Sequence, residues 1–325
     1  MPDASAPSCG ILLGAREVSI DPEKFLERPM KGKVVAESTG TGSGSRGPLY
    51  LVGTPIGNLE DITLRALRIL RESDLLACED TRQTQKLLNH YGITTRTTSY
   101  HEHNEKTKAV ELAQRLEQGA RIALVSDAGM PAISDPGFHL VKLCIQRQIP
   151  VVPIPGPTAI VSSLVASGLA THSFQYLGFP PAKRQLRRKF IASLGRYPAT
   201  SIFFEAPHRI LSTLADVLEL LGDRRMALGR ELTKLHEEFL RGSCSEVLAV
   251  LRSRPRLRGE MTVLIEGAPP SIALEAASQP LRERVDQLMQ EENLERMAAL
   301  KTVARERGIS KSQAYREYRA EPDSR

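Results

Sequence analysis

The chain of 325 residues has no tryptophan, only four cysteines and no long uninterrupted apolar run. No segment approaches the ~20 apolar residues that a membrane-spanning helix requires, and the opening segment MPDASAPSCGILLG lacks the basic start of a secretory leader. The cysteines are far apart, which argues against a zinc site. Cys78 and Cys144 fall in apolar patterns and are expected to be buried thiols in a reducing compartment. We therefore expect a cytoplasmic protein that binds no metal and has no membrane segment.

Acidic residues are also in deficit. The formal net charge is +6 and the isoelectric point is near 9.2, which favours a polyanionic partner but fits a merely basic protein equally well. The distribution is more informative than the total. The stretch from 181 to 196 contains no acid and carries Lys183, Arg184, Arg187, Arg188, Lys189 and Arg196.

Two α/β domains are predicted from the alternation of apolar strands with helical patterns. Residues 1–47 end in the linker-like run STGTGSGSRG and are expected to be a disordered extension. In 48–156, strands near 49–52, 75–78, 97–100, 122–126 and 151–154 alternate with helices, which is typical of a parallel sheet covered on both faces. In 157–268, two strands near 225–242 follow one another directly, which predicts a mixed sheet. The segment PIPGPT at 153–158 would be the hinge between the domains.

A helical region is predicted at 271–325, where β-branched runs disappear after Pro269 and Pro270. Within it, 293–319 has apolar periodicity broken at Gly308, with Ser310 as a helix N-cap, a pattern that indicates helix–turn–helix. Such a unit could grip RNA, or it could be a helical hairpin that docks on the body of the protein.

Four loops rich in glycine and proline follow predicted strand ends, where an open parallel sheet forms its ligand crevice. They are GTPIGN (53–58), CEDTR (78–82), SDAGMPAISDPG (126–137) and PIPGPT (153–158). The first has neither the third glycine of G-x-G-x-x-G nor a G-K-[ST], and the four loops together contain almost no Lys or Arg. This composition disfavours a pyrophosphate and favours a zwitterionic ligand held by backbone groups, such as S-adenosylmethionine. The alternative is that these residues only shape tight turns.

The blocks YLVGTPIGNLEDIT, ACEDTR, ALVSDAGMPAISDPG, VVPIPGPTA, FFEAPHRI, RELTK and GEMTVLIEG occur in this order between residues 48 and 268. They resemble the signature blocks of the ribosomal RNA small subunit methyltransferase I family, within the tetrapyrrole-methylase superfamily. The resemblance implies two α/β domains of the class III methyltransferase type with a donor cleft between them. It also implies a homodimer that uses S-adenosylmethionine to methylate the ribose 2′-hydroxyl of a cytidine in the decoding centre of 16S rRNA, within the 30S subunit.

By the same resemblance, the donor would lie against three groups of residues: the first loop, the loop after the fourth strand with the hinge, and the second domain. The positions implied are Pro55, then Asp127, Gly129, Met130, Ile133, Pro157 and Thr158, then Ala206, Leu232 and Thr262. No metal is implied, because methyl transfer from a sulfonium needs no Lewis acid.

A ribose hydroxyl is a poor nucleophile, so a group that accepts its proton or stabilises charge would assist the reaction. The candidates are Glu79, Asp80, Glu205 and Lys234. For Glu79 and Asp80 the competing interpretation is helix capping. Arg184, Arg187 and Arg188 share one helical face that would suit an RNA backbone, or would simply be a solvated basic surface. Further RNA contacts are expected from Asn58, Arg82, Lys183 and Arg209.

Two rival functions remain open on the sequence. One is a corrinoid or porphyrinogen C-methyltransferase of the same superfamily, for which the TPIGN loop and the basic helix would be unnecessary. The other is a non-enzymatic nucleic-acid-binding regulator built around the helical tail, which would leave the four patterned loops unexplained.

Overall fold

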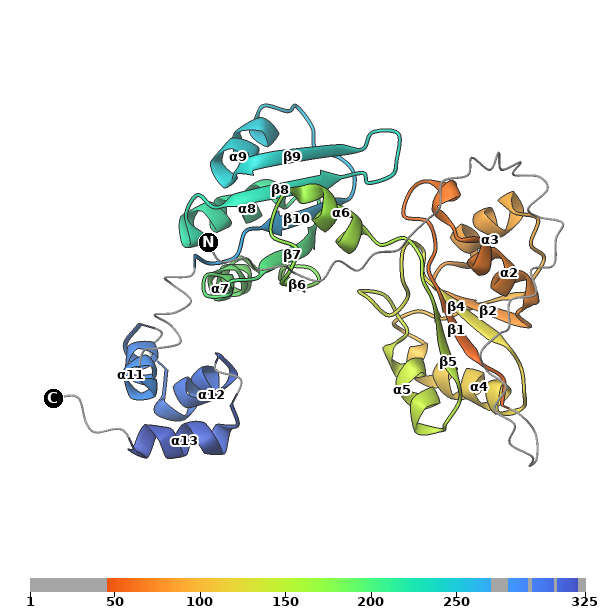
Figure 1. The fold of residues 1–325 in the computed structure, drawn as a ribbon, viewed down its shortest axis with the longest axis horizontal. Coiled ribbons are helices and arrows are strands. Elements are labelled where there is room, and N and C mark those ends of the chain that lie inside the picture. The colour runs from red at the N-terminus through yellow and green to blue at the C-terminus, as the bar shows by residue number, and fades with distance from the viewer. Residues whose placement is uncertain (1–45, 270–279, 292–293, 307–308, 321–325) are drawn as a thin grey trace, which may run out of the picture. The chain divides into compact units, whose positions relative to one another are not determined.

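The computed structural model describes residues 46–269, 280–291, 294–306 and 309–320 (Figure 1). Of the extension expected at 1–47, all but the last two residues lie outside the described part of the chain. The folded elements therefore begin with the first α/β domain.

The first domain is built on a five-stranded sheet in which every pair of neighbouring strands is parallel, as the sequence predicts. The strand order is β3-β2-β4-β1-β5. Pro153 is tolerated because β5 is an edge strand with only one neighbour to pair with. The strands are β1 (Leu49–Val52), β2 (Leu75–Cys78), β3 (Thr97–Ser99), β4 (Ile122–Val125) and β5 (Val151–Ile154).

Helices cover both faces of this sheet (Figure 1). Buried side chains of α2 (Leu64–Glu72) and α3 (Thr81–His90) form one core with Val52, Leu76 and Val125. Those of α4 (Glu105–Glu117) and α5 (Phe138–Gln146) form another with the residues that point to the opposite face. The alternation of side chains along each strand thus explains the continuous apolar runs, since both faces are buried.

The second domain has the mixed sheet that its closely spaced strands predict. The order is β6-β7-β10-β8-β9, and only β6 and β7 are parallel. Helices α7, α8 and α9 share a core on one face, while α6 packs on the other. The elements are α6 (Ala159–Ser167), β6 (Phe174–Tyr176), α7 (Arg184–Leu194), β7 (Thr200–Glu205), α8 (Ile210–Leu221), β8 (Arg225–Arg230), β9 (Glu238–Ser243), α9 (Cys244–Arg252) and β10 (Met261–Ile265).

The tail contains three helices in the ranges that the structure describes: α11 (Leu281–Glu291), α12 (Arg296–Glu306) and α13 (Lys311–Ala320). Their apolar side chains, among them Leu288, Leu300 and Tyr318, form a separate core. The Ser310 hydroxyl accepts a hydrogen bond from the Gln313 amide at 3.2 Å, which confirms the expected cap. The predicted break at Gly308 lies outside the described residues. None of the described helices is both long and apolar enough to cross a membrane.

Candidate functional site

The loops at the carboxyl edge of the first sheet are tied to one another. The backbones of Thr54 and Gly129 exchange two hydrogen bonds, of 2.9 and 3.0 Å, so the loop after β1 pairs with the loop after β4. A Cβ atom on Gly156 would lie only 2.8 Å from the Cα of Gly53. Glycine is therefore required where the loops after β1 and β5 cross.

The loop from 126 to 137 holds an uncommon backbone. Ala132 and Ser134 have φ angles of 68° and 61°, in the left-handed region that non-glycine residues rarely adopt. The Ser134 hydroxyl lies 2.5 Å from the hydroxyl of Tyr176 on β6, within hydrogen-bond distance. Strain of this kind persists where surrounding contacts enforce it, and it is common at ligand-binding sites.

This loop forms one wall of a cavity of about 400 Å³ to which both α/β domains contribute. The second domain supplies the end of β7 and the start of β10. These come together because the two strands are antiparallel and Met261 pairs with Glu205. The cavity lining includes Ile56, Gly129, Ile133, Asp135, Phe204 and Glu260.

The charged side chains among the described residues of the lining are all acidic: Asp135, Glu205 and Glu260. Two of these carboxylates already face cations, since Arg209 contacts Glu205 and Lys234 lies 3.3 Å from Glu260. Asp135 has no ion-pair partner among the described residues. Burial, followed by repulsion from Glu79 and Asp127, raises the pKa of Asp135 to about 6. A cationic ligand would relieve that repulsion, whereas a pyrophosphate would add to it.

Most of the expected donor-binding positions lie on this cavity. Gly129, Met130, Ile133, Thr158, Ala206 and Thr262 are part of its lining. Pro55, Asp127, Pro157 and Leu232 are not. Asp127 instead accepts a hydrogen bond from the backbone N–H of Asp80 at 3.1 Å, and Leu232 is buried.

Sequence reasoning missed Asp135, although it belongs to the quoted loop SDAGMPAISDPG. The loop carries two carboxylates eight residues apart, and only the first was singled out. The apolar walls Phe179 and Phe204 were also missed. They come from separate parts of the second domain, so no local motif brings them together.

Two of the catalytic candidates have structural tasks. Asp80 caps α3, accepting a hydrogen bond from the Arg82 amide at 2.8 Å, as the competing interpretation expected. Its pKa is lowered to about 2 by hydrogen bonds from Arg82. Glu205 accepts hydrogen bonds from the Ala206 amide and the Thr213 hydroxyl, at 2.8 and 2.6 Å. Both oxygens of Glu205 are thus engaged and its side chain is buried, so it is part of the scaffold of the cavity, and its catalytic role stays a prediction.

The other two candidates lie outside the cavity lining. Lys234 is held between Glu231, at 3.0 Å, and Glu260. Glu79 is half-buried beside Asp127, and its pKa is raised, first by burial and then by that neighbour. Neither residue is therefore placed at the reacting atoms by this geometry.

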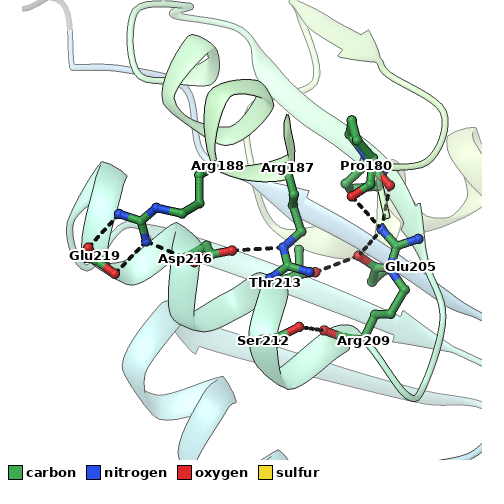
Figure 2. Close-up of polar contacts among 10 residues, drawn as sticks. Pro180, Arg187, Arg188, Glu205, Arg209, Ser212, Thr213, Asp216 and Glu219 are labelled. Carbon is green, nitrogen blue, oxygen red and sulfur yellow. Dashed lines mark hydrogen bonds and ion pairs between the residues drawn. The ribbon is translucent and has the colours of Figure 1, made fainter. Parts of the chain in front are cut away.

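The expectation that Arg184, Arg187 and Arg188 offer one open cationic face is wrong for two of the three (Figure 2). Arg187 is buried, and its Nε donates to Asp216 Oδ2 at 2.8 Å. Arg188 reaches Asp216 at 3.0 Å and Glu219 at 2.6 Å. Both guanidinium groups hold α7 against α8, so neither is free to bind a phosphate.

The remaining RNA candidates differ in availability. Lys183 and Arg184 are exposed at the start of α7. The Arg82 side chain is 88% exposed but pairs with Asp80 at 2.9 Å. Asn58 caps the short helix η1 (Leu59–Asp61), and Arg209 is engaged by Glu205 and by the carbonyl oxygen of Pro180. Because Glu205 lines the cavity, Arg209 is part of the scaffold beside it. Figure 2 shows the contacts of Arg209 with Glu205 and Pro180.

Comparison with known proteins identifies the class. The family model of the Tetrapyrrole (Corrin/Porphyrin) Methylases matches residues 48–248. The crystal structure of a diphthine synthase superposes with a TM-score of 0.52 at 13% identity, covering 70% of this chain and 94% of that one. A cobalt precorrin-4 methyltransferase gives a TM-score of 0.51 at 16% identity, covering 67% and 94%. The fold is that of the tetrapyrrole methylases, and the chain is a methyltransferase of this class.

Closer relatives narrow the assignment. Ribosomal RNA small subunit methyltransferase I of Halalkalibacterium halodurans is 46% identical over 284 residues, which is 85% of this chain and 96% of the relative. The protein of the same name from Thermotoga maritima is 48% identical over 221 residues, 68% of this chain and 99% of the relative. The chain belongs to the ribosomal RNA small subunit methyltransferase I family.

Proposed function

We propose that this protein transfers a methyl group from S-adenosylmethionine to the ribose 2′-hydroxyl of a cytidine in the decoding centre of 16S rRNA. The observation that carries the proposal is the cavity at the loops after β1, β4 and β5, in a chain 46% identical to a protein named for methylating small-subunit rRNA. The charged side chains among the described residues of its lining are carboxylates, which suit a cationic methyl donor. The substrate would be 16S rRNA or the 30S subunit, bound by a homodimer.

The cavity suits the donor in size and chemistry. Its volume of about 400 Å³ falls in the ~300–1,000 Å³ range of small-molecule sites. Backbone groups around Gly129 and Met130 would hold the methionine end, and Ala206 and Thr262 would lie near the adenine. When bound, S-adenosylmethionine supplies an electrophilic methyl group on a sulfonium sulfur.

The protein's contribution is to align the groups, exclude water and hold charge. Apolar side chains of Ile56, Ile133 and Phe204 line the cavity and would keep water from the donor. The loop that holds Ser134 in a left-handed backbone conformation places Asp135 in the cavity lining. That carboxylate would face the positive charge of the donor, in surroundings where electrostatic interactions are stronger than in water. Alignment of the hydroxyl with the methyl group is then the main catalytic requirement.

The alternative function within the class is C-methylation of a tetrapyrrole or corrinoid. It is favoured by the description of the family model and by the fold of the precorrin methyltransferase. That solved structure is 16% identical to this chain, against 42–48% for the relatives named for ribosomal RNA. The much closer similarity supports the RNA substrate.

The two substrates can be compared directly. The protein is incubated with S-adenosylmethionine labelled in the methyl group, and with either isolated 30S subunits or a tetrapyrrole precursor such as uroporphyrinogen III. We expect the label to appear in 16S rRNA. After nuclease digestion of that RNA, we expect the label in 2′-O-methylcytidine. Label in the tetrapyrrole, or in a base of the rRNA, would contradict the proposal.

A further inference from the structure

A second cavity, of about 340 Å³, lies beside the donor cavity and has the opposite charge. Its lining is contributed by the end of β8, the loop that follows it, and residues 254–259. It includes Arg230, Glu231, His236, Arg254, Arg256, Leu257, Arg258 and Gly259. Four arginines against one glutamate give this lining a net positive charge, which would favour an anion.

The arginines of this cavity fall into two pairs. Arg230 and Arg254 are fixed by Glu238, with nitrogen–oxygen distances of 2.8 and 2.5 Å. Arg254, and after it Arg230, lowers the pKa of Glu238 to about 2, so this acid stays charged. Arg256 and Arg258 are exposed, and neither forms an ion pair with any described residue. Two guanidinium groups of the cavity are therefore held in place by Glu238, and the other two can bind a ligand.

The glutamate in the lining does not cancel this charge. Glu231 accepts hydrogen bonds from Lys234 at 3.0 Å and from the backbone amide of Glu260 at 2.9 Å. Its carboxylate is therefore paired with Lys234, which Glu260 shares, and it holds the segment around Gly259. A Cβ atom on Gly259 would lie 2.4 Å from Glu231 Cγ, so the two segments are in close contact.

The two cavities meet at Gly259, which lines both. Glu260, the next residue, lines only the donor cavity, and Arg258, the one before it, lines only the basic cavity. A ligand in the basic cavity would therefore lie directly next to whatever accepts the methyl group. In RNA, each ribose is flanked by phosphates, so a ribose hydroxyl at the donor cavity brings phosphates to its edge.

We infer that the cavity containing Arg256 and Arg258 binds the phosphate backbone of the RNA next to the methylated nucleotide. The inference rests on the proposed function, since it takes the methyl acceptor to be an RNA ribose. It also replaces the face of α7 as the main phosphate contact, because Arg187 and Arg188 are committed to acids on α8. Planar guanidinium groups suit this task, since they can donate two hydrogen bonds to one phosphate.

The test compares a double variant, Arg256→Gln with Arg258→Gln, with a control that removes the same charge elsewhere. Arg65 and Arg96 are exposed arginines of the first domain, and they likewise form no ion pair with a described residue. Affinity for 30S subunits is measured for wild type, the double variant and the control Arg65→Gln with Arg96→Gln, at several salt concentrations. Calorimetry of S-adenosylmethionine binding tests whether each variant retains the donor cavity.

Each lost phosphate contact lowers the slope of log affinity against log salt by about 0.7–0.9. We expect the double variant to bind 30S subunits more weakly, with a slope reduced by about one to two units, and to bind the donor as wild type does. The control should keep the wild-type slope. An unchanged slope in the double variant, or an equal loss in the control, would overturn the inference. If wild type itself neither bound nor methylated 30S subunits, the proposed function would fail instead.

Discussion

Arg187 Nε lies 2.8 Å from Asp216 Oδ2, and the two side chains are only 8% and 6% exposed. This buried ion pair joins α7 to α8 in the second domain (Figure 2). Replacing one partner leaves the other charge buried without compensation, which typically costs about 3–5 kcal/mol. Asp216→Asn should lower the free energy of unfolding by about that amount, measured by denaturant titration.

The matched control is Glu219→Gln, which removes the exposed partner of Arg188. The Glu219 side chain is 60% exposed, and surface pairs of this kind contribute about 1 kcal/mol or less. Equal losses in the two variants would contradict the view that Arg187 has a structural role.

The close crossing of the loops after β1 and β5 leads to a second prediction. In Gly156→Ala, the new Cβ would lie 2.8 Å from Gly53 Cα, so the loops must separate. Overpacking of this kind costs about 1–3 kcal/mol, and the movement should also weaken donor binding. Gly195→Ala at the end of α7 is the control, because Gly195 has right-handed backbone angles and its new Cβ would meet nothing closer than 3.2 Å. If Gly156→Ala kept the melting temperature and the donor affinity of wild type, this prediction would be wrong.

Donor binding should depend on pH through Asp135. The carboxyl has a pKa of about 6 in the free protein, so it is charged at neutral pH and loses its charge in mild acid. A cationic donor prefers the charged form. Affinity for S-adenosylmethionine should therefore fall as the pH is lowered through about 6, by at most about tenfold per pH unit. Calorimetry between about pH 7.5 and 5 measures it.

Asp135→Asn should bind the donor more weakly at neutral pH and remove this pH dependence. Because folding raises the pKa of Asp135, the folded state is penalised when the carboxyl is ionised, and stability from this group is lost as the pH rises through about 6. The variant without donor should therefore melt at a higher temperature than wild type near neutral pH. Glu72→Gln, at a carboxylate outside the cavity that is 47% exposed and paired with Arg68, should change neither property appreciably. A pH dependence that survived Asp135→Asn would exclude this role.

The helical tail should be dispensable for the fold of the body. Helices α11, α12 and α13 share a core of their own, containing Leu288, Leu300 and Tyr318, so their removal does not open the cores of the two sheets. A chain ending at Ala268 should keep the melting temperature of the body and the affinity for the donor, while losing affinity for 30S subunits. A large fall in melting temperature would favour the alternative of a hairpin docked on the body.

Much of this architecture could be predicted because local patterns determine it. The apolar runs at 49–52, 75–78 and 122–125 are strands buried on both faces, and the direct succession of β8 and β9 required a mixed sheet. Loop composition predicted a ligand crevice at this edge of the sheet, where residues of three of the loops line a cavity. Pairings between distant residues could not be predicted. The helical face of Arg187 and Arg188 looks open in the sequence, and only the packing of α7 on α8 places Asp216 beside it.

The same reason accounts for the features of the site that the sequence did not show. Glu205 follows a strand end, where catalytic carboxylates are common, but Thr213 and Arg209 of the next helical segment engage both of its oxygens. The raised pKa of Asp135 depends on burial and on two nearby carboxylates. Glu79 belongs to the loop after β2, and Asp127 lies earlier in the same loop as Asp135. Such environments arise only once the chain has folded.

The most direct test of the proposed function is to map ribose methylation along 16S rRNA from cells with and without this protein. Methylated 2′-hydroxyl groups resist alkaline cleavage, so each site can be read by sequencing the fragments. We expect one 2′-O-methylcytidine in the decoding centre to disappear when the protein is absent and to return when it is restored. An unchanged methylation pattern in 16S rRNA would contradict it.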